Sequence, residues 1–281
     1  MQRFRGTAED RTRLFDNGDS QSETLNGKPQ TANRELQTYK PVSFLGVTFA
    51  GLDETADLEK LKEIRSLYFT VEWGVRLAVE HQGRETGFPD IDWIRKLAPE
   101  LNLSAQLWGK SAADFLQGDD AELMTCYGAC WAQFRRIQID SPKHMDAVDL
   151  PKLIGLLAKN PEKQIVFRVR DQNLDIADAL VAQGIPCATL FDQSEAQDPT
   201  QKKWPKGVER FAGCGYAGGL GPDNIYKQLS PILNAAQSAE RWWVEIDSSL
   251  RTPEEEQHAF SLASCKRTIR EFDAFFLDYT I

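Results

Sequence analysis

The chain has 281 residues, of which 41% are hydrophobic and 27% are charged. This composition is typical of a globular protein, and the length fits one barrel domain of about 250 residues or two small domains. The formal net charge is −9 and the pI is near 5.0. This acidity argues against a nucleic-acid partner or an anionic membrane surface, because both bind basic surfaces.

Signals for membrane insertion, secretion and metal binding are weak. The sequence contains no run of about 18 apolar residues, the length that a membrane-spanning helix needs. The first residues, Met1 to Arg5, lack the apolar stretch of a secretory signal. The cysteines form no C-x-x-C pair and are Cys126, Cys130, Cys187, Cys214 and Cys265. Their number is odd and most lie in apolar segments, so we expect a reduced, cytoplasmic compartment. With only three histidines in the sequence we expect no metal site, and we also expect no cofactor and no membrane partner.

Residues 1–40 are polar and show no sustained hydrophobic period. Asn17-Gly18 and Asn26-Gly27 are turn signals within this segment. We therefore predict a tail, or a strap over the domain surface. The alternative is a short capping helix, around Glu9–Phe15, that covers the bottom of the domain.

From residue 41 to residue 281, short apolar runs alternate with amphipathic stretches, and this predicts a single α/β domain. The predicted strands are Val42–Thr48, Ser66–Trp73, Asn102–Trp108, Arg136–Asp140, Gln164–Val169, Pro186–Phe191, Glu209–Cys214 and Trp242–Ile246. The predicted helices are Asp57–Arg65, Asp90–Leu101, Ala121–Phe134, Leu150–Lys159, Asn173–Gln183, Pro222–Ala235 and Leu262–Phe276.

The strand pattern favours a closed (β/α)₈ TIM barrel. Nearly continuous apolar strands indicate burial on both faces, as in a parallel sheet. Eight strands that alternate with helices match a closed barrel better than an open sheet. The alternative is an open, doubly wound sheet, which is disfavoured because no G-x-G-x-x-G turn follows the first predicted strand.

In such a barrel the functional side chains lie at the carboxyl ends of the strands. Polar residues predicted at or just beyond these ends are Glu72, Lys110, Gln138, Asp140, Arg168, Arg170, Asp192, Glu245 and Asp247. Side chains alternate along a strand, so only some of these residues point into the barrel.

The segment Ala217–Ile225, with the sequence AGGLGPDNI, predicts a phosphate site. Gly218 and Gly219 let the backbone approach an anion closely, and their N–H groups can form a concave nest. A helix predicted directly after them would add the favourable end of its dipole. Ser248 and Ser249 follow the eighth strand, beside the usual phosphate position of these barrels. The alternative is a tight turn without a ligand.

Ala217–Ile225 also resembles the A-G-G-L-x-P-x-N-V signature of the phosphoribosylanthranilate isomerase family. Phe44–Thr48 is similar to that family's K-I-C-G-L-T first strand, Thr189–Asp192 to its L-L-D sixth strand, and Trp243–Ser249 to its V-D-V-S-S-G eighth strand. The resemblance covers nearly the whole predicted barrel. It implies a ribulose-phosphate-binding type of barrel that acts on a small phosphorylated substrate.

The departures from the family's motifs concern its chemistry. The resemblance places Leu45 at the cysteine that acts as the family's general base, and Asp192 at its general acid. Because leucine cannot transfer a proton, we do not expect the family's own isomerisation. The glycine-rich stretch after the general acid is replaced by Gln193–Pro199, and Asp247 stands where the family has an uncharged residue. The chain therefore resembles a branch without the catalytic cysteine.

Two interpretations follow from the phosphate loop. The first is an isomerase- or lyase-type enzyme for a sugar-phosphate-type substrate, with Asp192 and Glu72 as catalytic groups. Lys110 and Asp140 are alternatives for the second catalytic group, and each carboxylate could instead form only a salt bridge to a strand-end arginine. The residues predicted to bind the substrate are Gly218, Gly219, Ser248, Ser249, Lys110 and Arg168. The second interpretation is a barrel that binds a phosphorylated ligand without turnover, which the missing base favours.

A third interpretation is a magnesium enzyme. Carboxylate oxygens are ligands that Mg²⁺ prefers. The residues that would supply them are Glu72, Asp140, Asp192 and Glu245.

Overall fold

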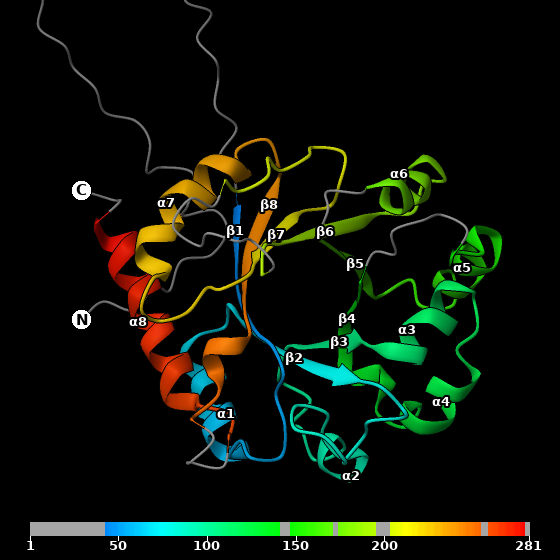
Figure 1. The fold of residues 1–281 in the computed structure, drawn as a ribbon, viewed down its shortest axis with the longest axis horizontal. Helices are drawn as coiled ribbons and strands as arrows, with labels where there is room; N and C mark the ends of the chain where they lie inside the picture. The colour runs from blue at the N-terminus through cyan, green and yellow to red at the C-terminus, as the bar shows by residue number, and fades with distance from the viewer. Residues whose placement is uncertain (1–42, 141–146, 171–173, 195–202, 254–257, 279–281) are drawn as a thin grey trace, which may run out of the picture.

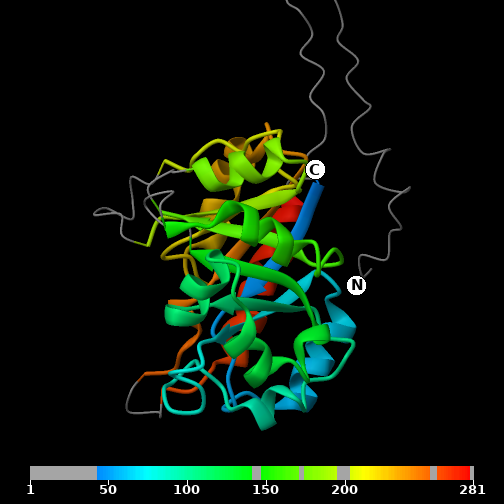
Figure 2. The same cartoon turned by 90° about the vertical axis from the view of Figure 1, so that its right-hand side faces the viewer.

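The protein is described in a computed structural model, over residues 43–140, 147–170, 174–194, 203–253 and 258–278. Eight parallel strands close into a barrel in chain order, with β8 paired to β1. The helices lie outside the strands (Figures 1 and 2). The predicted (β/α)₈ barrel is therefore confirmed. The expected tail or cap over residues 1–40 lies outside the described residues.

The strands are β1 (Ser43–Phe49), β2 (Val71–Leu77), β3 (Leu103–Leu107), β4 (Phe134–Asp140), β5 (Gln164–Val169), β6 (Cys187–Asp192), β7 (Cys214–Ala217) and β8 (Arg241–Ile246). The helices are α1 (Leu58–Leu67), α2 (Ile91–Ile94), α3 (Gly109–Leu116), α4 (Ala121–Tyr127), α5 (Leu150–Leu157), α6 (Asp175–Ala182), α7 (Ile225–Ala236) and α8 (Leu262–Asp278). Two 3₁₀ helices, η2 (Trp131–Gln133) and η4 (Ser248–Leu250), precede β4 and follow β8. No helix in the described part of the chain has the length and apolar character needed to cross a bilayer.

The helices begin where the sequence provides caps. The carboxylate of Asp57 accepts hydrogen bonds from the backbone N–H groups of Glu59 and Lys60, at 3.0 and 3.1 Å, and this satisfies donors in the first turn of α1. Asp149 caps α5 in the same way. Helix α8 contacts both α7 and α1, so it joins the last and first helices of the outer layer (Figure 1).

Alternation along the strands divides the core into two parts. In β2, Val71, Trp73 and Val75 are fully buried against the helix layer, so Glu72 and Gly74 face the interior of the barrel. Apolar side chains fill the middle of the interior, and they are Val166, Ala188, Leu190, Ala217 and Trp243. Polar side chains lie above and below them, which distinguishes this barrel from one packed with aliphatic layers alone.

Two predicted strands were misplaced. The second was expected at Ser66–Trp73, but α1 continues to Leu67 and β2 begins only at Val71. The seventh was expected at Glu209–Cys214, whereas β7 begins at Cys214. The hydrophobic pattern did not reveal β7, because this strand is short and contains Gly215. A Cβ atom on Gly215 would lie only 2.3 Å from Cε2 of Trp243, so glycine is required at this interior position.

The helix predictions failed mainly on either side of β3. The long helix predicted at Asp90–Leu101 is the short α2, and α3 was not predicted. Helix α3 begins directly after Trp108 at Gly109, whose φ of +54° is left-handed. A glycine there reads as a loop signal in the sequence, although it opens a helix.

Candidate functional site

The loop between β7 and α7 carries the paired glycines. Gly218 and Gly219 adopt φ angles of +109° and +59°, which side chains disfavour. A Cβ atom on Gly218 would also lie 2.4 Å from the backbone of Gln193 and Ser194. The glycine is therefore needed both for the conformation of its own loop and for close contact with the loop that follows β6.

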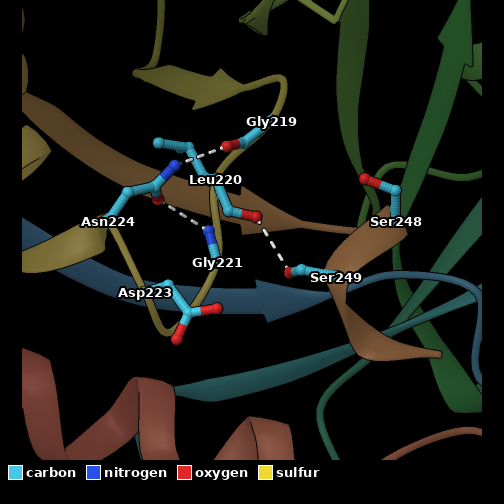
Figure 3. Close-up of a pocket in the computed structure, with 7 residues that line it drawn as sticks. All are labelled: Gly219, Leu220, Gly221, Asp223, Asn224, Ser248 and Ser249. Carbon is cyan, nitrogen blue, oxygen red and sulfur yellow. Dashed lines mark hydrogen bonds between the residues drawn. The ribbon is translucent and has the colours of Figure 1, made fainter. Parts of the chain in front are cut away.

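Side chains at the start of α7 and in η4 hold this loop in shape (Figure 3). The Asn224 amide accepts a hydrogen bond from the Gly221 N–H at 3.0 Å and donates one to the Gly219 carbonyl at 2.7 Å. From the other side, the Ser249 hydroxyl donates to the Leu220 carbonyl at 2.9 Å. The loop after β7 is thus tied to the loop after β8.

A cavity of about 230 Å³ opens between these two loops. It is lined by Gly219, Leu220, Gly221, Asp223, Asn224, Ser248 and Ser249. Neither Gly219 nor Ser248 donates its backbone N–H to a partner within the described residues. The carboxylate of Asp223 is paired with Arg267 at 2.5 Å. Free donors and the amino end of α7 thus converge on one space, as in an anion site. Gly219, Ser248 and Ser249, all predicted, are brought together here.

Asp192, the predicted acid, lies at the carboxyl end of β6 and is buried. The Arg168 guanidinium donates to it through Nε at 2.9 Å and pairs through Nη2 at 2.8 Å. Arg170 lies 3.4 Å from the same oxygen, and Ser194 donates through its N–H and its hydroxyl. Asp192 thus forms ion pairs with the strand-end arginines, as the alternative interpretation of this carboxylate required. In this arrangement Asp192 accepts every one of these hydrogen bonds.

Glu245 on β8 is the second buried carboxyl group of the upper interior, with 1% of its surface exposed. Its Oε2 atom accepts a hydrogen bond from Gln106 at 3.1 Å, and its Oε1 atom accepts one from Gln138 at 3.2 Å. Burial raises the pKa of Glu245 to about 7, against the opposing effect of the Arg168 charge. Asp192 and Glu245 thus occupy different environments, one ionic and one made of neutral amides.

The structure corrects the predicted position of Glu72. Because β2 begins at Val71, Glu72 lies at the amino end of its strand and not at the carboxyl end. It accepts a hydrogen bond from Thr48 at 2.8 Å and pairs with Arg136 at 3.2 Å. A separate cavity of about 300 Å³ opens beside it at the amino ends of β1, β2, β4 and β5. Glu72 and Asp192 therefore lie at opposite ends of the barrel and do not form the expected pair.

Lys110 is also placed away from the cavity between the β7 and β8 loops. It follows β3 in the first turn of α3, and its Nζ atom lies 2.5 Å from carboxylate oxygens of both Asp114 and Glu122. Hydrogen bonds to these two groups raise the pKa of the Lys110 ammonium. Its charge is directed toward α3 and α4, so the structure does not bring it to the predicted phosphate loop. Arg168, by contrast, lies at the barrel mouth.

Leu45 lies toward the amino end of β1. It is the third residue of the strand, lines the amino-end cavity and packs against the interior apolar cluster that contains Trp243. The strand ends at Phe49, and Ala50, just beyond it, has no group that could transfer a proton.

The polar layer of Gln106, Gln138 and Glu245 was not predicted as a unit. Its sequence signal is a polar residue at every second position near the end of an apolar strand, as in Glu245 and Asp247 of β8 and its loop. The magnesium interpretation required Glu72, Asp140, Asp192 and Glu245 to converge. Within the described residues, no group of three or more His, Cys, Asp or Glu side chains could hold a metal ion.

The chain was compared with known proteins. No family model and no curated protein matches the sequence. Among solved structures, TrpF from Jonesia denitrificans is 14% identical with a TM-score of 0.50, over 82% of this chain and 98% of that one. A phosphoribosylanthranilate isomerase from Thermotoga maritima is 14% identical with a TM-score of 0.47, over 82% and 99% of the chains. KGPDC from Streptococcus mutans is 13% identical with a TM-score of 0.46, over 84% and 99%. At 14% identity, the similarity to TrpF concerns the barrel fold alone.

Proposed function

We propose that the chain binds a small phosphorylated, sugar-derived molecule at the carboxyl end of its barrel and catalyses an isomerase- or lyase-type reaction on it. The observation that carries this proposal is the cavity between the β7 and β8 loops, where the free N–H groups of Gly219 and Ser248 meet the amino end of α7. Such converging donors stabilise a phosphate group without a cationic side chain.

The remaining roles follow from proximity. Gly218 contacts the backbone of Gln193 and Ser194, directly after Asp192. A ligand whose phosphate lies at the glycine loop therefore extends toward the Asp192–Arg168 pair. Arg168 would orient the ligand's oxygens, and Asp192 would hold Arg168 and contribute to proton transfer. Because Asp192 accepts hydrogen bonds from Arg168 and Ser194, we assign it the acceptor side of that transfer.

A non-catalytic, phospho-ligand-binding barrel is the second candidate. The observation in its favour is that Ala50, at the end of β1, has no ionisable group, and that Asp192 is already bound by Arg168, Arg170 and Ser194. A carboxylate engaged in this way has less freedom to exchange a proton with a substrate.

Binding is tested with sulfate, with ribose 5-phosphate and with unphosphorylated ribose, measured by calorimetry. Sulfate and the phosphate ester should bind, and ribose should not. Gly219→Asp should abolish binding of both anions, because it places bulk and negative charge in the loop. The matched control is Gly184→Asp, since Gly184 has a φ of +77° and open space around its Cβ position. Unchanged affinity in Gly219→Asp would contradict the proposed site.

Turnover is tested by incubating the protein with phosphorylated aldoses and ketoses in D₂O. Deuterium incorporation at carbon, followed by NMR, reports proton abstraction even when the products are unknown. Asp192→Asn should reduce this exchange by about 10²–10⁴-fold if Asp192 takes part in proton transfer. Binding of the phosphate esters without any exchange would favour the non-catalytic barrel.

A further inference from the structure

The upper interior of the barrel contains a buried layer of acid and amide side chains. Bulky aliphatic residues usually fill this region of a (β/α)₈ barrel, but here Glu245, Gln106 and Gln138 face one another from β8, β3 and β4. Each is at least 95% buried, with exposed fractions of 1%, 3% and 5%. Burying three such groups is costly unless they are hydrogen-bonded, and both carboxyl oxygens of Glu245 have a donor.

The neighbouring strand makes room for this layer. A Cβ atom on Gly74 of β2 would lie 2.6 Å from Nε2 of Gln106. The same Nε2 atom donates to Glu245. Any larger residue at position 74 would push this amide away from the carboxyl group, so the glycine belongs to the construction of the layer.

The groups that act on Glu245 come from three strands. They are Arg168 from β5, Asp247 just beyond β8 and Glu72 from β2, while β3 and β4 contribute only the neutral amides. Burial has the largest effect and raises the pKa of Glu245 to about 7, with the two acidic neighbours raising it further and Arg168 lowering it. Glu245 therefore exchanges its proton near neutral pH.

Arg168 connects this interior group to the barrel mouth. Although burial opposes the change, the negative charges of Glu245, Asp192, Asp140 and Asp247 raise the pKa of Arg168. The positive charge of Arg168 thus offsets the negative charges of both Glu245 and Asp192. When Glu245 takes up a proton, one of these charges disappears, and the mouth becomes more positive by one unit. Ser248, which lines the cavity, follows Glu245 by three residues, so their backbones are at most about 10 Å apart.

We propose that anion binding at the Gly218–Gly221 loop is coupled to protonation of Glu245, with Arg168 as the link. The proposal rests on the proposed function, because it requires an anion at that loop. Glu245 acts through Arg168 and through the charge of the mouth, so it is a positioning residue and not one that contacts the ligand. An anion should then bind more tightly as the pH falls through neutrality.

Sulfate is the appropriate probe, because it remains a dianion between pH 6 and pH 8 whereas a phosphate ester titrates there. Its Kd should tighten by about threefold from pH 8 to pH 6, the size expected for one charge acting on a dianion about 10 Å away. Glu245→Gln should remove this dependence. The matched control, Glu240→Gln, makes the same change at an exposed position just before the same strand and should retain it. Histidines remain in both variants, so any contribution from them persists in both.

A second measurement uses the unaltered protein and is needed if Glu245→Gln does not fold. Calorimetry of sulfate binding in two buffers with different heats of ionisation reports proton uptake. Near neutral pH the coupling predicts uptake of about a third of a proton per sulfate bound. Binding with the same Kd at both pH values and no proton uptake overturns the coupling alone. Absence of any sulfate binding overturns the coupling together with the proposed anion site.

Discussion

The two ends of the barrel interior each contain an arginine paired with a carboxylate. At the amino end, Arg136 lies 3.2 Å from Glu72, and the two side chains are 12% and 16% exposed. At the carboxyl end, Arg168 lies 2.8 Å from Asp192, and the exposed fractions are 9% and 0%. The pairs are chemically alike, so ion pairing alone does not distinguish a functional end from a structural one.

The surroundings of the two pairs differ. The guanidinium of Arg136 lies 4.4 Å from the centre of the Trp243 ring and also donates to Gln164, so it closes the bottom of the core. Arg168 faces two carboxyl groups and stands beside a loop with free N–H donors. The two similar ion pairs therefore differ in what surrounds them: an aromatic ring and an amide at the amino end, and a second buried carboxyl group at the carboxyl end.

The largest expected effect on the free energy of unfolding comes from replacing Arg168, and replacing Arg136 provides the comparison. Arg168→Met leaves the fully buried Asp192 without its main cation, which should cost about 3–5 kcal/mol of unfolding free energy. Arg136→Met leaves Glu72 with its Thr48 hydrogen bond and a neighbouring cavity that water can enter. That loss should be about 1–2 kcal/mol. Urea denaturation of both variants at one pH measures the difference, and equal losses would break the comparison.

The second prediction concerns the pH dependence of stability. The pKa of Glu245 rises from 4.5 to about 7 on folding, so the folded state binds more protons than the unfolded state within that window. The contribution of Glu245 to the free energy of unfolding is fully present below pH 4.5. It is lost as the pH rises to about 7, by roughly 3 kcal/mol in total. Unfolding free energies of the unaltered protein and of Glu245→Gln should therefore diverge between pH 5 and pH 8. Parallel curves would show that Glu245 does not carry the proton.

A smaller effect is expected from the hydroxyl groups at each end. Ser249→Ala removes the hydrogen bond to the Leu220 carbonyl and loosens the glycine loop, so sulfate affinity should fall by about fivefold, equivalent to about 1 kcal/mol. Thr48→Val removes the comparable bond to Glu72 at the amino end. Thr48→Val should lower the free energy of unfolding without changing the sulfate Kd. If Thr48→Val weakened sulfate binding and Ser249→Ala did not, the anion would bind at the amino end of the barrel.

The sequence predicted the local parts of the site better than the long-range parts. Gly219, Ser248 and Ser249, which the sequence analysis grouped together, line one cavity, because each lies directly after the end of a neighbouring strand. The interior layer around Glu245 depends on three strands far apart in the sequence, and no local pattern reveals which amides reach one carboxyl group.

The errors in the predicted site came from strand boundaries. Strands buried on both faces read as continuous apolar runs, so their ends are poorly marked. The second strand was predicted to end at Trp73, whereas β2 continues to Leu77, and this placed Glu72 at the wrong end of the barrel. The first strand, predicted at Val42–Thr48, was placed to within one residue of β1. The overall barrel was unaffected, because its closure depends on the number and order of the elements.

The smallest effect is expected at Lys110, which the sequence placed among the anion-binding residues. Its ammonium is held by Asp114 and Glu122, and β3 lies across the barrel from β7. An exposed, paired charge separated from a ligand by more than a screening length, about 8 Å at physiological ionic strength, contributes little to binding. Lys110→Met should therefore change the sulfate Kd by less than about twofold, whereas Arg168→Met, where it folds, should weaken binding more at the same salt concentration. If Lys110→Met weakens sulfate binding as much as Ser249→Ala does, the anion lies nearer to β3, and the cavity between the β7 and β8 loops is not where it binds.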